Sequence, residues 1–489
     1  MATEIELKLQ LTPQATRQLA AHPLLAGIKP QRQHLLNTYY DTPDLELQQR
    51  RIALRFRKKG VQWLLTVKSG EAARGGLAQR SEWEAPASPG VFDFSHVDNP
   101  ELRTWLEARV ARLVPVFTTD FQRTIRIVPF GKSEIELAVD RGSVESKGRK
   151  AAICETELEL VRGRLGDILA LARTLQETLA LRPMVASKAE RGYAMFSGTP
   201  PAPFRAKVAP LNAKMTPLEA FRSIALDCLE HFQRNEQGLL VSQDPEYVHQ
   251  ARVALRRLRS ALKLFAPALP ADFVATYGET WGNLAGALGD TRNWDVFISE
   301  TLPPIAVAFP QHRDTVRLQK IAVRHAATAR AEVARRVALP ECPRLIVDFT
   351  SALFALDDIL PKKLDDFGRD RLQARARQAR RLATRHAELD AEARHEMRIC
   401  FKKLRYAVEF FGSLLPSQRL ARYLTTLAQL QDELGMINDH VTAQALLDEA
   451  LKGHPPGPVH GWIAGRHELL VYELPEALDI WLAQKAPWK

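Results

Sequence analysis

The chain opens with the stretch EIELKL, residues 4–9, in which charged and apolar residues alternate without interruption. Successive side chains of a β-strand point to opposite faces, so the stretch predicts a strand with one charged face and one apolar face. An ordinary half-buried strand would show the same alternation with its charges in water. The strands that follow decide between these two interpretations.

Up to about residue 197, strand-like runs repeat this arrangement and are separated by turn residues. In each run the ionisable residues share one parity, so they project from one face. They are Glu4, Glu6 and Lys8; Arg55 and Arg57; Lys68; Arg80, Glu82 and Glu84; Arg123; Glu134, Glu136 and Asp140; and Glu155, Glu157 and Glu159. We therefore predict a closed antiparallel β-barrel with flanking helices, whose lumen carries charges of both signs.

Such a lumen is costly to bury unless it holds a ligand that binds both kinds of charge. Basic side chains bind phosphate oxygens, and carboxylates are preferred ligands of magnesium or manganese. The pattern thus favours a phosphate chain bridged by a divalent metal.

After a linker rich in proline and alanine, residues 198–215, the chain has a helical period to its end. A helix is predicted to begin at Thr216 and Pro217, as N-cap and first helical residue. The region repeats itself, with HQARVALRRLR at residues 249–259 and HEMRICFKKLR at residues 395–405. We predict an all-α domain over 216–489, made of two related four-helix bundles, about 216–345 and 346–489.

In both copies of the repeat, cations recur at helical spacing beside an apolar stripe. No acidic residue lies between His249 and Lys263, so ion pairs within the helix do not account for the stripe. Two copies in register predict a basic channel for an anion. Proteins that bind single-stranded nucleic acid interleave aromatic residues for base stacking, and these stripes hold none on the basic face. Phosphate without bases is the expected ligand.

The composition limits the class of protein. A chain of 489 residues is expected to form two or three domains, and its net charge of +11 weakly indicates an anionic partner. No apolar run approaches the roughly 20 residues that span a bilayer, and no export signal is recognisable. The four cysteines are scattered and predict neither a disulfide framework nor a zinc site. We expect a cytoplasmic protein without a membrane or nucleic-acid partner.

Both halves resemble known families. EIELKL is similar to the ExExK signature of the CYTH family, the triphosphate tunnel metalloenzymes. The runs LRFR, TVK, RSEWE, EIELAVDRG, ETELEL and SKAERGY extend this resemblance over residues 1–197. The repeat with its two histidines resembles the CHAD domain, a conserved-histidine α-helical domain that binds inorganic polyphosphate, over residues 216–489.

The CYTH resemblance implies a metal-dependent inorganic triphosphatase that cleaves triphosphate to pyrophosphate and phosphate. It implies a catalytic group of Glu4, Glu6 and Lys8; phosphate binding by Lys8, Arg55, Arg57, Lys68, Arg123 and Lys188; and Mg²⁺ or Mn²⁺ binding by Glu4, Glu6, Asp140, Glu155 and Glu157. Parity does not decide whether Arg123 or Arg126 faces the lumen. Glu82 and Glu159 are expected either to support these residues or to be solvated.

The CHAD resemblance implies a polyphosphate channel lined by His249, Arg252, Arg256, Arg257, Arg259, His395, Arg398, Lys402, Lys403 and Arg405. The histidines are expected either to donate to phosphate or to be structural. Asp295 and Asp439 are expected to be structural partners of the basic helices. The resemblance also makes association with polyphosphate granules an expectation.

Two alternatives to an inorganic triphosphatase stay open. Thiamine triphosphatases and class IV adenylate cyclases share the fold, but their substrates need a pocket for an organic group, and no residues for one are recognisable. A non-enzymatic polyphosphate-binding or granule-targeting protein would gain little from acidic residues in EIELKL and ETELEL. These carboxylates favour the enzyme.

Overall fold

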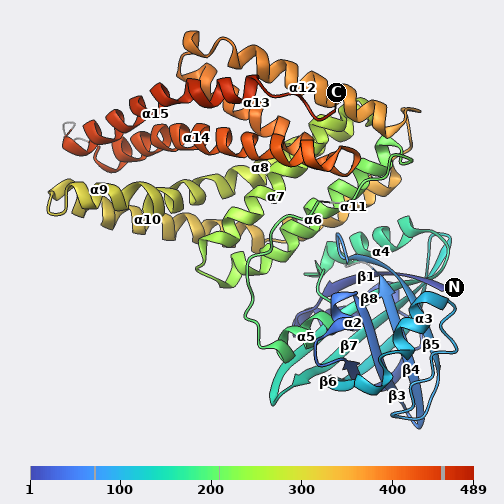
Figure 1. Ribbon diagram of the computed structural model, residues 1–489. Helices are drawn as coiled ribbons and strands as arrows, with labels where there is room; N and C mark the ends of the chain where they lie inside the picture. The colour runs from blue at the N-terminus through green and yellow to red at the C-terminus, as the bar shows by residue number, and fades with distance from the viewer. Residues whose placement is uncertain (1, 71–72, 209, 453–456, 489) are drawn as a thin grey trace. The chain divides into compact units, whose positions relative to one another are not determined.

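The computed structural model describes residues 2–70, 73–208, 210–452 and 457–488, which fall into two compact units (Figure 1). The barrel unit comprises Met1–Ala202 and Leu339–Ala355, and the helical unit comprises Pro203–Ala338 and Leu356–Lys489. The polypeptide therefore passes between the units three times. Among the described residues, no helix is long and apolar enough to cross a membrane.

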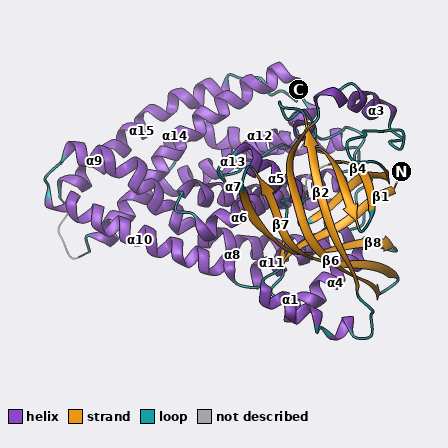
Figure 2. Cartoon of the chain, turned by 90° about the horizontal axis from the view of Figure 1, so that it is seen from below, coloured by secondary structure: helices purple, strands orange, loops and turns teal. Residues whose placement is uncertain are grey.

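Eight long antiparallel strands form the barrel (Figure 2). They are β1 (Ala2–Gln10), β2 (Gln31–Asp41), β3 (Ile52–Lys59), β4 (Gln62–Gly70), β5 (Leu77–Pro86), β6 (Val114–Phe130), β7 (Ser133–Ser146) and β8 (Arg149–Arg162). Their order is β5-β4-β3-β2-β6-β7-β8-β1, and pairing of β1 with β5 closes the ring. The two-residue strand β9 (Arg182–Pro183) pairs with the end of β1. The predicted closed antiparallel barrel is confirmed.

Strand β1 shows why the barrel has a charged interior. Leu7 and Leu9 are fully buried in an apolar core that includes residues of helices α1 (Pro13–Ala20) and α4 (Leu165–Thr178). Burial of a leucine side chain contributes about 1.5–3 kcal/mol, so the apolar face of β1 is held against these helices. The period of two then turns the alternate residues, Glu4, Glu6 and Lys8, into the barrel.

Shorter helices complete the barrel unit: α2 (Glu46–Gln49), α3 (Pro100–Glu107), α5 (Lys188–Ser197) and the 3-10 turns Pro23–Leu25 and Val110–Arg112. Helix α5 begins with a capping box, in which Ser187 and Glu190 satisfy each other's backbone N–H groups. This cap fixes the first helical residue, Lys188, which is buried and lines the interior of the barrel.

Helix α11 (Glu341–Ala355) lies far along the chain but belongs to the barrel unit. Val347 is fully buried in the core shared by β1 and α4. Arg344 donates from Nε and Nη2 to the carbonyl of Gln176 at 3.0 and 2.7 Å, at the C-terminal end of α4. The sequence analysis assigned these residues to the helical domain, because an amphipathic pattern does not reveal which core the helix covers.

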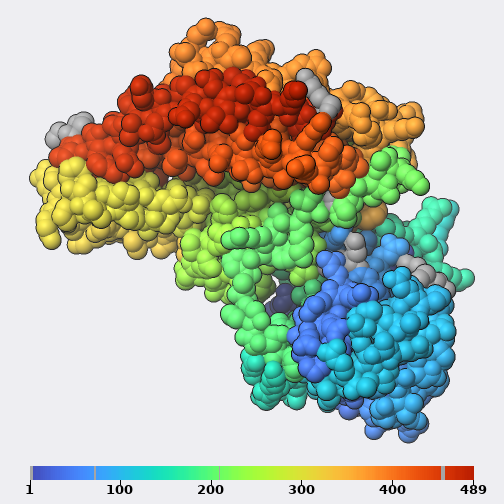
Figure 3. All heavy atoms as spheres, viewed as in Figure 1, coloured from blue at the N-terminus to red at the C-terminus, as the bar shows by residue number. Residues whose placement is uncertain are grey.

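The helical unit consists of α6 (Pro217–Val241), α7 (Pro245–Phe265), α8 (Ala271–Val296), α9 (Leu302–Ala308), α10 (Arg313–Ala338), α12 (Leu364–Ala383), α13 (Ala391–Phe410), α14 (Ser417–Ala450) and α15 (Pro458–Leu482). A π-helical turn, Phe297–Thr301, joins α8 to α9. Thr216 caps α6 in a capping box with Glu219, as the sequence predicts. Helices α14 and α15 pack side by side and form a continuous layer of atoms in Figure 3. The predicted all-α architecture is confirmed.

Candidate functional site

The barrel unit encloses a cavity of about 390 Å³ with ionisable side chains of both signs. The residues predicted from the sequence that line it are Glu4, Glu6, Lys8, Arg55, Arg57, Lys68, Arg123, Glu157 and Lys188. Glu82 and Glu159, whose roles the sequence left open, also line it. Arg123 lines the cavity and Arg126 does not, which answers the question that strand parity alone left open.

Cations and carboxylates neutralise one another across this cavity. Lys68 Nζ donates to both carboxylate oxygens of Glu4, at 2.9 and 2.8 Å, and lies 3.0 Å from Glu82. Lys8 Nζ lies 2.8 Å from Glu6. Because these groups are largely withdrawn from water, each charge depends on its partners. A ligand that carries phosphate oxygens and a divalent metal can bind both kinds of group at once.

Asp140, Glu155 and Glu157, here called the acidic cluster, each place a carboxylate oxygen within 4.8 Å of the others. This donor set suits Mg²⁺ or Mn²⁺. The cluster also binds cations: Arg123 donates to both oxygens of Asp140 at 2.7 and 2.6 Å, and Lys188 donates to Glu157 at 2.9 Å. Burial disfavours the charged form of Lys188, but the three carboxylates outweigh it and hold its pKa above the usual value. Asp140 and Glu155 do not line the cavity, so they fix Arg123 and Lys188 from behind.

Glu136 and Glu159 are cross-strand neighbours on β7 and β8, and both line the cavity. Neither side chain forms a hydrogen bond or ion pair with any residue in the described part of the chain. Burial and the nearby Glu4 raise the pKa of Glu159 to about 8, and burial raises the pKa of Glu136. Carboxylates in this condition are stabilised most by a nearby divalent cation. They therefore favour metal binding on the side of the cavity that carries Glu4 and Glu6.

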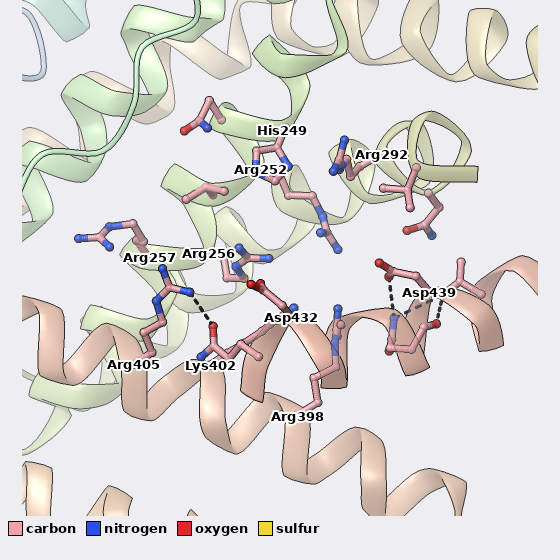
Figure 4. A pocket seen from close by; sticks show the side chains of 18 of the residues that line it. His249, Arg252, Arg256, Arg257, Arg292, Arg398, Lys402, Arg405, Asp432 and Asp439 are labelled. Carbon is pink, nitrogen blue, oxygen red and sulfur yellow. Dashed lines mark hydrogen bonds between the residues drawn. The ribbon is translucent and has the colours of Figure 1, made fainter. Parts of the chain in front are cut away.

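The helical unit contains a larger pocket, of about 980 Å³, formed mainly by α7, α8, α13 and α14. Figure 4 shows cationic side chains of α7 and α13 directed into the same space. The predicted residues that line this pocket are His249, Arg252, Arg256, Arg257, His395, Arg398, Lys402 and Arg405. The two copies of the repeat thus contribute to one basic pocket.

Several of these cations lack an acidic partner. Arg257 and Arg405 share the carboxylate of Glu409. Those that form no ion pair with any described residue are Arg252, Arg256, Arg398 and Lys402. Side chains that ordinarily pair on a protein surface are here left with their positive charges facing a common cavity, which favours a ligand with many negative charges.

Burial and mutual repulsion oppose the positive charges in this pocket. Burial, Arg256 and Arg398 lower the pKa of Lys402 to about 6. Burial and Arg292 lower the pKa of His249 to about 4. A bound anion would reduce the cost of burying these positive charges, because its oxygens replace the lost water. It would also offset the repulsion between the cations.

Comparison with known proteins assigns both units to families. The family model described as CYTH domain matches residues 2–193, and the model described as CHAD domain matches residues 223–448. The chain carries a CYTH domain followed by a CHAD domain. Residues of the CYTH domain line the cavity of the barrel, and residues of the CHAD domain form the basic pocket.

Two similar proteins support these assignments. An inorganic triphosphatase of Haemophilus influenzae is 33% identical over 201 residues, which are 40% of this chain and 56% of that protein. The chain thus covers little more than half the length of this relative. The solved CHAD domain of the plant Ricinus communis is 32% identical and has a TM-score of 0.51, over 58% of this chain and 98% of that chain.

Two residues predicted to line the CHAD pocket lie elsewhere. Arg259 packs against α8, where its Nη2 would be 3.2 Å from a Cβ added to Gly282. Lys403 does not line the pocket, and its pKa is lowered by burial and by Lys263 and Arg375. A helix turns about 100° per residue, so Lys403 projects away from the direction of its neighbour Lys402.

The pocket also contains cations that the sequence analysis did not select. Arg205 comes from the predicted linker and Arg292 from α8. Arg292 stands in the segment LGDTRNWDVF, residues 288–297, which lies outside the repeated basic stretches.

The structure also places the acidic and histidine residues of the CHAD domain. Asp295 accepts a hydrogen bond from Arg330 Nη2 at 2.6 Å, which is the arrangement expected of a structural partner. Asp439 lines the pocket. His395 Nδ1 lies 2.8 Å from the side-chain oxygen of Asn438, so one ring nitrogen is engaged within the protein.

In the CYTH domain, the sequence analysis missed the neutral residues Asn37 and Tyr39 of β2. Arg57 Nε donates to Asn37 Oδ1 at 3.0 Å, and Arg55 Nη1 donates to the Tyr39 hydroxyl at 3.0 Å. Both partners follow from the register of β2 and β3, which pairs residue 37 with 57 and residue 39 with 55. The alternating polar residues of NTYYD, residues 37–41, carry this signal in the sequence, although Asn37 and Tyr39 bear no charge.

Proposed function

We propose that the CYTH domain is a metal-dependent inorganic triphosphatase and that the CHAD domain binds inorganic polyphosphate. The proposed triphosphatase activity rests on the barrel cavity, in which carboxylates and cations alternate. A triphosphate chain offers oxygens to the cations, and a divalent metal bound with it offers charge to the carboxylates. Similarity to an inorganic triphosphatase over the CYTH domain supports the substrate class.

In this proposal Arg55, Arg57 and Arg123 bind and orient the phosphate oxygens, since their planar guanidinium groups suit bidentate contacts. Lys8 and Lys68 stabilise the charge that develops on the bridging oxygen as its bond to phosphorus breaks. Glu4, Glu6 and Glu157 line the cavity and would hold magnesium or manganese, with Asp140 and Glu155 supporting them from behind. The metal would supply positive charge that offsets the charge of the phosphate chain. The enclosed barrel limits access of other water, which strengthens each electrostatic contact.

The proposed polyphosphate binding rests on the pocket cations that form no ion pair. A polyphosphate chain has one negative charge or more per phosphate and no base or sugar. Tyr406 also lines the pocket, but Arg256 and Arg257 lie over its ring, so the ring is already covered by cations. Phosphate oxygens would replace the carboxylate partners that these cations lack. Such binding would hold the protein at polyphosphate granules in the cytoplasm.

Phosphate release from four compounds tests the proposed activity. With Mg²⁺, we expect the highest kcat/KM on inorganic triphosphate, compared with ATP, thiamine triphosphate and long-chain polyphosphate. Preference for thiamine triphosphate or ATP would favour the alternative enzymes of the same fold. Binding of polyphosphate without hydrolysis of any of the four compounds would favour a binding protein.

Polyphosphate binding is expected to take up protons above pH 6. Lys402, with its pKa of about 6, is largely neutral at pH 7.5, whereas a bound anion favours its charged form. Affinity should therefore fall as the pH rises from 6 to 8. Calorimetric titrations at pH 7.5 in two buffers of different ionisation enthalpy measure the uptake. The Lys402→Gln variant should take up fewer protons, by up to about one per bound chain. Equal uptake by both proteins would contradict this role of Lys402.

A further inference from the structure

Lys402 places a primary amine among arginine side chains in the basic pocket of the CHAD domain. Arg398 precedes it by one turn on α13, and Arg252 and Arg256 come from α7. Figure 4 shows Arg252 and Arg398 directed toward each other across the same space. Among the described residues, Lys402 has no hydrogen-bond or ion-pair partner. Its amine therefore meets positive charge from two helices, and no carboxylate pairs with it.

The acidic residues of the pocket do not offset this positive charge. Glu409 is engaged by two other arginines. Asp439 of α14 faces Lys402, but it favours the charged amine less than each of the three arginines opposes it. Asp432, on the same helix, also lines the pocket. Burial and the arginines together lower the pKa of Lys402 to about 6, so the amine is largely neutral at pH 7.5.

A neutral lysine amine is a nucleophile, and lysines placed beside other cations are activated in this way. The charges of the pocket decide which product they stabilise. An uncharged amide, the product of acylation, would gain nothing from the arginines, whereas an anionic product would form charge-assisted hydrogen bonds with them. Carbon dioxide gives an anionic product, since it adds to an amine to form a carbamate. The pocket, of about 980 Å³, readily admits this small molecule.

We propose that Lys402 is a site of reversible carbamate formation with carbon dioxide. The lone pair of Nζ attacks the carbon of carbon dioxide and forms an N–C bond. The electron pair of one C=O bond moves to its oxygen, and Nζ releases one proton to water. The product carries one negative charge, and the step needs no oxidant, reductant or leaving group. The proposal goes beyond polyphosphate binding and does not depend on it.

The neighbouring arginines have donors available for a carbamate. Arg256 Nε donates to the hydroxyl of Tyr406 at 2.6 Å, which holds the guanidinium in place and leaves its terminal nitrogens for a ligand. Arg398 Nε is buried, and no residue in the described ranges accepts its hydrogen bond. Arg398 and Lys402 stand four residues apart on α13, a spacing at which like charges repel and opposite charges attract. Carbamate formation would turn this repulsive pair into an attractive one.

The carbamate would compete with polyphosphate for the same arginines. It would also place a negative charge where the proposed ligand carries its own. Carbon dioxide should therefore weaken polyphosphate binding, and bound polyphosphate should release carbon dioxide to the same extent, because the two effects are thermodynamically linked. Carbon dioxide would in this way regulate the CHAD domain.

Carbon-13 NMR of the full-length protein in labelled bicarbonate at pH 7.5 tests the site. We expect a carbamate resonance from the wild type that Lys402→Gln lacks. Lys403→Gln is the matched control and should keep the resonance, because Lys403 is the next residue of α13 and lies outside the pocket. The α-amino group, with an ordinary pKa of about 8, also forms a carbamate and serves as a reference in all three proteins.

A second measurement locates the carbamate without any variant. Alkylation of the wild-type carbamate with a trialkyloxonium salt, followed by mass spectrometry of its peptides, should find the added group on Lys402. Identical spectra of the wild type and Lys402→Gln would overturn the proposal. Trapping of the group on other amines but not on Lys402 would also overturn it.

Equilibrium binding of long-chain polyphosphate at pH 7.5 tests the competition. Bicarbonate, compared with chloride at equal ionic strength, should weaken binding by the wild type about twofold or more, the loss expected once half of the molecules carry the carbamate. Lys402→Gln should show no such loss. Equal weakening in both proteins would indicate competition by bicarbonate itself and overturn the regulatory role of Lys402. A wild type that forms the carbamate but does not bind polyphosphate would contradict the proposed function and leave the assignment of the carbamate intact.

Discussion

Replacing Glu4 and Glu6 together by glutamine should lower kcat for inorganic triphosphate by at least about a thousandfold. Both carboxylates line the cavity from β1, and Glu6 is the cross-strand neighbour of Glu159 on β8. Glutamine keeps their size but cannot supply the negative charge that binds a divalent metal. The loss should therefore occur at every Mg²⁺ concentration, with KM changing less than kcat.

The control for this experiment is Glu134→Gln, on β7. Glu134 pairs with Arg162 at the exposed end of the strand and does not line the cavity. We expect this variant to retain wild-type activity. Polyphosphate binding by the CHAD domain should be the same in all three proteins, and an unchanged melting transition of the barrel unit should show that the double variant is folded. A double variant that keeps more than a tenth of wild-type kcat would contradict the proposed role of these carboxylates.

Removal of three cations from the CHAD pocket should abolish most polyphosphate binding. We expect Arg256→Gln/Arg398→Gln/Lys402→Gln to weaken the affinity for long-chain polyphosphate by at least about a hundredfold, since each charge-assisted bond contributes about 1.5–3 kcal/mol. The dependence of affinity on salt should also become weaker, because fewer charges are matched in the complex. Equilibrium binding at two salt concentrations measures both effects.

The same variant should be more stable than the wild type in the absence of anions. In the folded protein the pKa of Lys402 lies far below its value in an unfolded chain, so at pH 7 the folded state carries a penalty that glutamine removes. A raised melting temperature together with lost binding would exclude simple unfolding as the cause. Replacing Arg335, Arg336 and Arg377 by glutamine removes the same number of basic side chains from exposed positions of α10 and α12. This control should bind as wild type, and equal loss in both variants would indicate nonspecific attraction.

The barrel could be predicted because a strand offers only two face assignments. Charges that recur on one parity in β1, β3 and β8 cannot all face water in a ring whose outside is covered by helices such as α4. The cations of α7 and α13 could be predicted from their spacing and repetition. In the barrel the period of two, and in the helices the period of 3.6, indicated which residues share a face. The structure confirms the architecture.

The orientation of other site residues could not be predicted, because it depends on side-chain packing and not on the spacing of residues in the sequence. Lys402 and Lys403 are adjacent cations, yet the helix rotates one into the pocket and the other toward α12. The place of Tyr39 in the site could not be predicted because its side chain is neutral: its ring stacks on Phe117 and its hydroxyl accepts a hydrogen bond from Arg55. Asp140 and Glu155 have the parity of the lumen, but Arg123, Lys188 and Arg191 cover them, so they act from behind the cavity.

Helix α11 has a consequence for the order in which the protein forms during its synthesis. The strands of the barrel have all left the ribosome once residue 202 has been translated, but the core beneath β1 lacks Val347 until residue 355 appears. At about 5–20 residues per second, the intervening 153 residues (355 minus 202) take roughly 8–30 s. During this interval the nascent barrel exposes the part of the apolar surface of α4 that α11 covers in the complete fold.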